Sequence, residues 1–342
     1  QQERPAESNQ ITEPASPGLV DRADPANATS WCRVEVLMGM GTANQRGRAT
    51  SPAPRMPRLR LTVKRTSPSW RAALEAAGSA GVSLVPVEGI EGSQRAAEVV
   101  EALWGPGQLP PSLIRAFEHA GTVIIGAESE ERLVGFVLGF PGLDEGLHMH
   151  SHMLGVLPHV QSRGIGFALK LGQRAGCLDL GIEEVRWTYD PLVTRNARFN
   201  LVKLGVLGTR LLHGFYGEMD DVINRGDRSD RFEVRWRLDS DRARRALRGE
   251  IGEASTGPVL LEAAGDRHAP RPKETGALPE PGAVIEVPVD YHGLRRRDPA
   301  LGAAWRDASA RAFQACFEAR LVAASITRDG RYAFEPAQEA GE

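Results

Sequence analysis

Residues 148–169 of the chain read His-Met-His-Ser-His-Met-Leu-Gly-Val-Leu-Pro-His-Val-Gln-Ser-Arg-Gly-Ile-Gly-Phe-Ala-Leu, and this stretch decides the fold. Its pattern predicts a strand over 147–156, then a turn, then a helix that begins after Gly164. Gly164 and Gly166 let backbone N–H groups crowd around one point at this junction. The helix dipole places partial positive charge at the same point, so the stretch predicts a cradle for a pyrophosphate without a P-loop lysine.

Composition restricts the classes of protein that need to be considered. The chain has 342 residues, 41% of them hydrophobic, and a formal net charge of −2. This charge argues against a protein that binds nucleic acid through bulk positive charge, so no nucleic-acid partner is expected. No apolar run of about 18 residues predicts a membrane span, and the first residues do not resemble a secretory signal. The three cysteines have no metal-binding or redox spacing, so we expect reduced thiols, no metal site and a cytoplasmic location.

The chain divides into four parts by composition. Residues 1–58 are rich in proline and lack apolar periodicity, which predicts a disordered leader; one possibility is that the natural start lies near Met56. We expect an α/β domain over 82–238, a Pro-, Gly- and charge-rich linker over 239–281, and a small C-terminal α/β element over 282–336. In the α/β domain the pattern predicts strands at 82–87, 122–127, 133–140, 147–156, 184–189, 207–216 and 232–238. Helices are predicted at 94–104 with Ser93 as cap, at 110–120, after Gly164, and at 196–204 with Gly205 as C-cap.

These motifs, in this order, resemble the GNAT superfamily of acyl-CoA-dependent N-acyltransferases. The family signature [Gln/Arg]-x-x-Gly-x-[Gly/Ala] after a strand is met by Gln161, Gly164 and Gly166. The run from Asn196 to Gly205 is similar to a second signature, in which an Asn precedes a helix that ends in Gly. Further runs resemble an uncharacterised bacterial subgroup that is often encoded beside N-acylamino-acid racemases: 151–156, 187–192, 196–200, 215–217 and 220–224.

The resemblance implies a mixed, splayed central sheet flanked by helices, with acetyl-CoA or another acyl-CoA as co-substrate. It implies that the backbone of Leu154, Val156 and Leu157 pairs with the pantetheine amides. The loop that starts at Gln161 and the N–H groups of Arg163, Gly164, Ile165 and Gly166 would hold the pyrophosphate, and Asn196 would lie near the pantetheine or the thioester. The acyl group, most simply acetyl, would pass directly to a small-molecule amine, which on the subgroup resemblance is an amino acid or a derivative.

Three histidines are candidates for the proton transfer that amine acylation requires. His148, His150 and His152 alternate along one strand, so their side chains are expected on one face. His150 and His152 are similar in spacing to the paired histidines of aralkylamine N-acetyltransferases, so either is a candidate base, directly or through water. The alternative is that they form core hydrogen bonds or face solvent. A zinc site is not expected, because this spacing spreads the three side chains over about 13 Å.

The sequence departs from the family at the position of the usual general acid. Many GNAT enzymes carry a Tyr there that protonates the leaving thiolate, whereas this chain has Leu201. Tyr216 and Tyr189 are candidates for the role by residue type alone. A non-catalytic acyl-CoA-binding module therefore stays open as an alternative, while a nucleotide-binding protein is disfavoured because no P-loop lysine is present.

Two further features have an ordinary structural explanation. Asp190-Pro191 is expected to form a turn after a strand, and Trp187 and Trp236 are expected in the core. The acidic stretch could bind a cationic substrate, but a solvated loop is the favoured interpretation; its members are Asp220, Asp221, Asp227 and Asp230.

Overall fold

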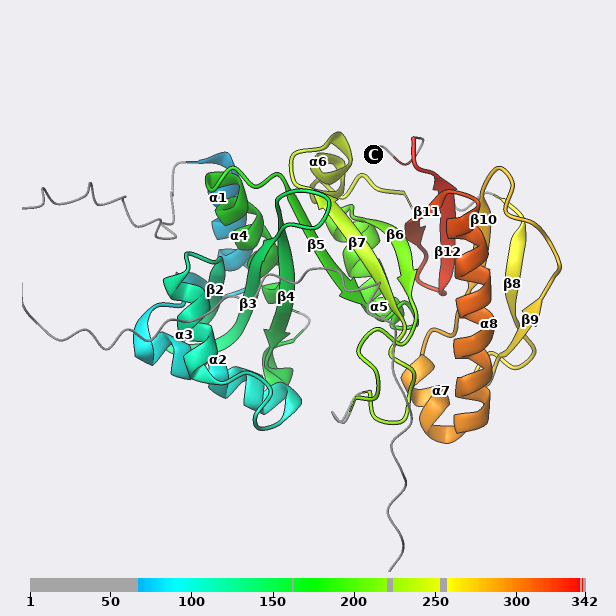
Figure 1. Cartoon of the computed structure of the whole chain (residues 1–342), viewed down its shortest axis with the longest axis horizontal. Helices are drawn as coiled ribbons and strands as arrows, with labels where there is room; N and C mark the ends of the chain where they lie inside the picture. The colour runs from blue at the N-terminus through cyan, green and yellow to red at the C-terminus, as the bar shows by residue number, and fades with distance from the viewer. Residues whose placement is uncertain (1–66, 162, 220–223, 253–256, 339, 341–342) are drawn as a thin grey trace, which may run out of the picture. The chain divides into compact units, whose positions relative to one another are not determined.

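The computed structural model describes residues 67–161, 163–219, 224–252, 257–338 and 340. The leader expected over 1–58 lies outside this described part. Within it, twelve strands form one mixed sheet in the order β1-β2-β3-β4-β5-β7-β6-β11-β12-β10-β8-β9 (Figure 1). The strands are β1 (Ser83–Pro86), β2 (Ile124–Ser129), β3 (Arg132–Gly142), β4 (His148–Val156), β5 (Glu184–Tyr189), β6 (Leu207–Leu212), β7 (Arg231–Arg237), β8 (Val259–Ala264), β9 (Arg271–Glu274), β10 (Ala283–Glu286), β11 (Leu321–Ile326) and β12 (Arg331–Pro336).

Helices cover both faces of this sheet. They are α1 (Pro68–Ser79), α2 (Gly89–Trp104), α3 (Pro111–His119), α4 (Ile165–Asp179), α5 (Thr194–Arg198), α6 (Asp241–Leu247), α7 (Tyr291–Arg297) and α8 (Pro299–Glu318), with a 3₁₀ turn η1 (Pro158–Val160) and a π-helical turn η2 (Phe199–Leu204). Alternate residues of β3 point to opposite faces: Val137 packs in the core cluster of α1 and α4, and Phe136 and Leu138 pack in that of α2. The mixed, helix-flanked sheet expected from the sequence is therefore present.

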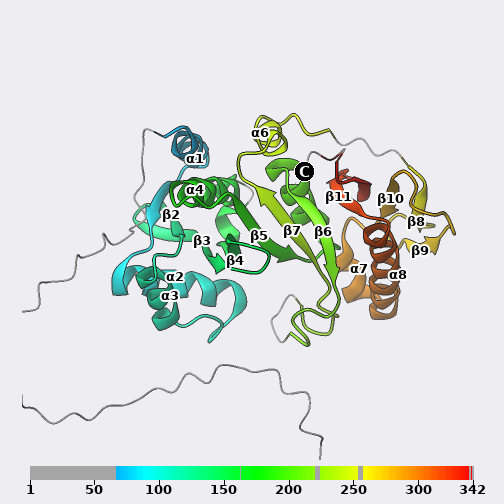
Figure 2. The same cartoon turned by 45° about the horizontal axis from the view of Figure 1, so that its top comes forward.

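β4 and β5 separate part-way along their length, and this opens the sheet. β4 pairs with β3 as far as Val156, but its parallel pairing with β5 ends at His150 and Arg186. A β-bulge accompanies the separation, because Leu138 lies opposite Met153 while the next residue of β3 lies opposite Ser151. The second half of β4 thus leaves the edge that faces β5 unpaired by that strand (Figure 2). Bulges of this kind are frequent beside active sites.

The C-terminal residues continue the same sheet. β11 pairs antiparallel with β6 at Ala323 and Gly208, and a Cβ on Gly208 would lie only 3.0 Å from the Cβ of Ala323. Residues 239–281, which were expected to form a linker, contain one helix and two strands, namely α6, β8 and β9. The element expected over 282–336 is therefore integrated with the preceding strands.

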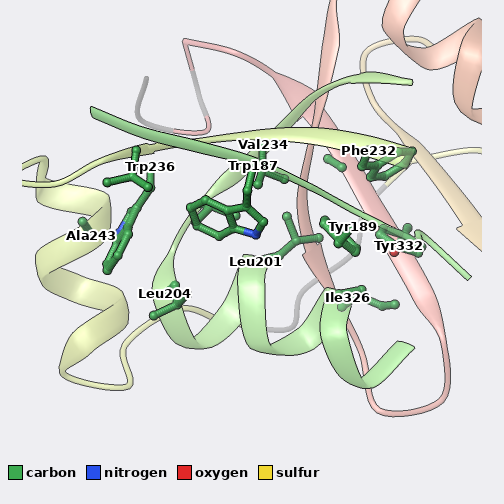
Figure 3. Close-up of a cluster of buried hydrophobic side chains, with 14 of the residues drawn as sticks. Trp187, Tyr189, Leu201, Leu204, Phe232, Val234, Trp236, Ala243, Ile326 and Tyr332 are labelled. Carbon is green, nitrogen blue, oxygen red and sulfur yellow. The ribbon is translucent and has the colours of Figure 1, made fainter. Parts of the chain in front are cut away.

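A continuous aromatic core spans this junction. Trp187 and Trp236 are buried, as predicted, with ring centroids 6.1 Å apart. Further along β7, Phe232 lies 4.6 Å from Phe313 of α8 and 5.8 Å from Tyr332 of β12, again between ring centroids. Figure 3 shows the side chains of β5, β7, η2 and the C-terminal strands meeting in one cluster. Burial of such large rings stabilises the joined sheet.

Several local predictions need correction. Helix α1 was not expected; Ser67 caps it by accepting a hydrogen bond from the N–H of Trp70 at 3.2 Å, and Pro68 begins it. Helix α2 begins at Gly89, so Ser93 is not its cap; the Ser93 hydroxyl donates to the carbonyl of Gly89. β6 ends at Leu212 and does not reach 216.

No helix in the described part is both long enough and apolar enough to span a membrane.

Candidate active site

A cavity of about 550 Å³ lies between β4, the start of α4, and α5 with η2; we call it the loop cavity. Seven of the nine residues predicted to bind the co-substrate line it: Leu154, Val156, Gln161, Gly164, Ile165, Gly166 and Asn196. Its other lining residues are Phe167, Val193, Arg195, Arg198, Phe199 and Lys203. The strand, the glycine loop and the Asn-containing helix thus meet around one hollow, although they are far apart in the sequence.

The glycine loop is shaped by the start of α4. Gly164 has φ = +94°, a left-handed conformation that favours glycine, and its carbonyl accepts hydrogen bonds from the N–H groups of Phe167 and Ala168 at 3.0 Å. The N–H groups of Ile165 and Gly166 precede the first helical hydrogen bond, as at any helix N-terminus. A Cβ on Gly166 would meet only Leu154, at 3.9 Å. The missing side chain therefore leaves room for a ligand to approach the backbone.

Two of the predicted binding residues, Gln161 and Leu157, have a structural role, and two, Leu157 and Arg163, lie outside the cavity lining. The Gln161 amide donates to the carbonyl of Val156 at 2.9 Å and so ties the loop to the end of β4. The N–H of Leu157 donates to the carbonyl of Val134 at 2.9 Å, so it is already used by β3 and does not suit the pairing with pantetheine expected of it. Arg163 is exposed and does not line the loop cavity.

A second cavity of about 390 Å³ lies where β4 and β5 separate; we call it the fork cavity. It shares Leu154, Asn196 and Phe199 with the loop cavity, so the two adjoin. The remaining lining residues are Trp104, Gln108, Ser151, His152, Met153, Lys170, Trp187, Thr188, Tyr189, Asn200, Tyr216, Met219 and Asn224. Aromatic rings with a few polar groups are typical of small-molecule sites.

The three histidines of β4 differ in position. His152 is exposed and lines the fork cavity, whereas His150 is half-buried and His148 is buried, with its Nδ1 2.9 Å from the carbonyl oxygen of Gly146. The rings of His150 and His152 share a side of the sheet, since both lie against Phe140, with centroids 5.1 and 5.7 Å away. Burial and the neighbouring histidines lower the pKa of His150 to about 4, and burial also lowers the pKa of His152. His150 is therefore neutral at neutral pH but a weak proton acceptor.

Lys170 is a residue of the fork cavity that the sequence did not single out. It is buried in α4, where its Nζ donates to the Ser151 hydroxyl at 2.7 Å and to the Gln173 side-chain oxygen at 3.1 Å. The Nζ also lies 3.7 Å from the ring centroid of Trp187. Burial lowers the pKa of this amine to about 7. An amine that titrates near neutrality in a cavity is a candidate for proton transfer.

The π-helical turn η2 decides which side chains reach the fork cavity. Asn200 lines it, whereas Leu201 is fully buried in the core and points toward Trp187 and Tyr189 (Figure 3). The position that carries the acid in many GNAT enzymes, where the sequence has Leu201, thus faces away from the cavity. Tyr216, which does line it, has its hydroxyl 3.1 Å from that of Thr188. π-helical turns occur often at functional sites.

The end of β5 is held by a buried ionic network. Asp190 forms the expected turn by accepting a hydrogen bond from the N–H of Leu192, and it also makes two hydrogen bonds of 2.8 Å with Arg306 of α8. Arg306 also contacts Asp227, at 2.5 Å. Arg228 pairs with the buried Asp230, at 2.8 Å. The solvated-loop interpretation is therefore wrong for Asp227 and Asp230, while Asp220 and Asp221 lie outside the described residues.

A comparison with family models finds a match over the region that contains most of this site. Residues 94–195 match the acetyltransferase (GNAT) family. The matched residues are similar to this family and make up less than half of the chain. The match contains β4, the glycine loop, α4 and β5, so it covers most of the loop cavity. The fold class and the enzyme class expected from the sequence, an acyl-CoA-dependent N-acyltransferase, are thereby confirmed.

Solved structures with a similar fold are acetyltransferases. One is a putative GNAT acetyltransferase from Desulfovibrio desulfuricans, with 16% identity over 46% of this chain and 99% of that chain and a TM-score of 0.37. Another is Arabidopsis thaliana Naa50 in complex with a bisubstrate analogue. It is 20% identical, the match covers 45% of this chain and 97% of that chain, and the TM-score is 0.38. A third is the diaminobutyrate acetyltransferase EctA from Paenibacillus lautus in complex with its substrate and coenzyme A. It is 17% identical, the match covers 47% of this chain and 97% of that chain, and the TM-score is 0.36. Such distant likeness carries no information about the acceptor. No match to a curated protein was found.

In the described part of the chain, no group of three or more His, Cys, Asp or Glu side chains is placed to hold a metal ion.

Proposed function

We propose that this GNAT domain transfers an acyl group, most simply acetyl, from acyl-CoA directly to the amine of a small molecule. The observation that carries the proposal is the meeting of two cavities at Leu154, Asn196 and Phe199, one with a helix N-terminus and one with proton-transfer groups. The first suits a pyrophosphate and pantetheine, and the second suits an acceptor. The reaction is proposed to take place in the cytoplasm.

The walls of the loop cavity fit an acyl-CoA chemically. Backbone N–H groups at Ile165 and Gly166 offer hydrogen bonds to phosphate oxygens at the positive end of the α4 dipole. On the facing wall, α5 and η2 contribute three cationic side chains, those of Arg195, Arg198 and Lys203. The unpaired edge of β4 beyond His150 can receive the pantetheine amides. In this proposal, these contacts hold the thioester near the fork cavity, and the enzyme forms no covalent intermediate.

The fork cavity supplies candidate groups for the acceptor. His152 is the more accessible of the two proposed bases, because it lines the fork cavity. His150 does not line the cavity, and its ring contacts Phe140. Tyr216 remains a candidate acid, because its hydroxyl lies on the cavity wall. An amino acid or an amino-acid derivative is the acceptor class to test first, on the resemblance to the racemase-associated subgroup.

Binding of CoA is tested with Gly166→Val. The added side chain would enter the loop cavity, yet the nearest atom to its Cβ is 3.9 Å away, and Val has a higher helix propensity than Gly. We expect CoA affinity to fall about 100-fold, the equivalent of two lost hydrogen bonds to charge at about 1.5 kcal/mol each, with no loss of thermal stability. Gly164 is a poorer probe, because its φ of +94° would strain any other residue.

The control is Gly78→Val in α1, where a Cβ would meet no atom within 4 Å. Isothermal titration calorimetry should give this variant wild-type affinity for CoA. Equal affinity in the wild type and in a folded Gly166→Val variant would show that CoA does not use this loop.

A further inference from the structure

Lys170 stands out among the buried ionisable groups because no carboxylate in the described part of the chain pairs with it. The neighbours of its Nζ are the Ser151 hydroxyl, the Gln173 side-chain oxygen and the face of Trp187. Only 3% of the residue is exposed, yet it lines the fork cavity. A buried ammonium without a counter-ion is costly, so a lysine in this setting needs an explanation beyond packing.

We propose that Lys170, with Ser151 as its hydrogen-bond partner, donates the proton that CoA thiolate needs when acyl transfer breaks the C–S bond. The inference rests on the proposed function and deepens it, because it assigns the acid that the chain lacks at Leu201. Both Lys170 and Ser151 line the fork cavity, at the point where β4 and β5 separate.

The protons and electrons balance in this step. The acceptor nitrogen forms a bond with the thioester carbon, and the C–S electron pair goes to sulfur. The Lys170 ammonium gives one proton to that sulfur, directly or through the Ser151 hydroxyl, and CoA leaves as a thiol. The proton that the acceptor nitrogen loses passes to His152 or to solvent. Neutral Lys170 then regains a proton from solvent.

The surroundings of Lys170 suit a proton donor. Burial opposes its charge, while the face of Trp187 supports the ammonium, so both protonation states are accessible near neutral pH. A free thiol has a pKa of about 8.5, so transfer from an amine with a pKa of about 7 to the thiolate is downhill. Among the described residues, the charges of His150 of β4 and Cys177 of α4 interact with Lys170, and His152, Tyr189 and Tyr216 share the fork cavity with it. Burial keeps the Cys177 thiol protonated by raising its pKa to about 12.

One test needs no acceptor: the ionisation of the thiol of bound CoA is measured by thiolate absorbance. The protein carries Cys32→Ser, which removes the signal of that cysteine. Below a pH of about 7, wild-type protein should hold a larger thiolate fraction than Lys170→Met does, because the Lys170 ammonium is still protonated there and stabilises the thiolate. The matched control is Lys273→Met, which replaces an exposed lysine of β9 that pairs with Glu262 of β8, and it should behave as wild type. Identical ionisation in wild type and Lys170→Met would overturn the inference even if CoA binds.

Turnover gives the second readout. The kcat of the wild type should fall as pH rises through about 7, where Lys170 loses its proton, and Lys170→Met should lose this limb together with about 10²-fold in kcat. Ser151→Ala should lower kcat by a smaller factor. Lys170→Met should not lower thermal stability, because it removes a buried amine.

Three results would contradict the assignment: wild-type kcat and pH profile in Lys170→Met, parallel losses of stability and CoA affinity in it, or an acyl-Lys170 intermediate that turns over. Absence of turnover in the wild type, with the thiol shift intact, would instead count against the proposed function alone.

Discussion

Replacement of Arg306 by Ala should destabilise the whole described unit and show that α8 belongs to the catalytic fold. The Arg306 side chain is 3% exposed, and it makes two 2.8 Å hydrogen bonds with Asp190 and one of 2.5 Å with Asp227. Truncation leaves these carboxylates buried without this partner, a loss that typically costs about 3–5 kcal/mol. At roughly 2–4 °C per kcal/mol for a large domain, the Tm should fall by about 6–20 °C.

The matched control lies on the same helix. Arg311 pairs with Glu274 at the surface, with 63% of its side chain exposed, so Arg311→Ala should cost less than about 1 kcal/mol. Urea denaturation of both variants gives the free energies of unfolding. A loss for Arg306→Ala within about 1 kcal/mol of that for Arg311→Ala would refute the reasoning.

The pH dependence of this effect has a definite sign. Although burial acts to raise the pKa of Asp190, its hydrogen bonds and charge interaction with Arg306 hold it below the ordinary value of 3.8. The stability that Asp190 contributes is therefore present above its unfolded pKa and lost as pH falls through its folded pKa. Without Arg306 the pKa of Asp190 should rise, so the gap between variant and wild type should be largest at neutral pH and should narrow in acid.

Three further predictions concern single positions. Leu201→Tyr should not raise kcat, because the side chain points into the filled core, and overpacking there should cost about 1–3 kcal/mol in urea denaturation; a gain in kcat would place this residue at the thioester. His152→Ala should lower kcat more than His150→Ala, since only His152 lines the fork cavity, and both variants should keep the limb near pH 7, because Lys170 sets it; wild-type kcat in both variants would make the histidines structural. Gly208→Val should weaken the β6–β11 pairing, because a Cβ added at this position would lie 3.0 Å from the Cβ of Ala323 and the two further methyl groups need more space. Unchanged hydrogen exchange in β11 would contradict this.

The loop cavity could be foreseen from the sequence because its determinants are local. Gly164 and Gly166 stand at a strand-to-helix junction, and Gly205 ends the Asn196 helix with φ = +72°. Such positions depend on backbone conformation within a few residues, which sequence patterns report well. The use of the Leu157 N–H by Val134 depends on strand pairing and was therefore missed.

Lys170 was missed because its burial depends on the strands beneath α4, where its Nζ contacts Ser151 of β4 and Trp187 of β5. In the sequence, a lysine and an arginine in α4 resemble the residues of a solvent-facing side. Ser67-Pro68 followed by small residues at 73 and 77 was the available signal for α1. Helix α1 packs on α4, whereas Lys170 and Arg174 are buried on the side of the strands, with Lys170 against Ser151 and Trp187 and Arg174 donating to the carbonyl of Leu238.

The C-terminal half was misread for a related reason. β9 is an edge strand with the sequence Arg-Pro-Lys-Glu, and charge and proline at a sheet edge prevent further pairing but resemble a linker. The pairing of β6 with β11 joins residues more than a hundred positions apart, and no local pattern predicts it. The π-helical turn at 199–204, which removes Leu201 from the cavity, is likewise decided by tertiary packing.

The most direct test of the central claim is incubation of the full chain with several acyl-CoAs and a panel of small amines that includes amino acids. Thiol release and the mass of the product are measured together. We predict acceptor-dependent release of CoA thiol in equal amount to an amide that carries the acyl group, with Gly166→Val inactive at the same CoA concentration. Tight binding of CoA without acceptor-dependent thiol release across the panel would contradict the account and indicate a non-catalytic acyl-CoA-binding module.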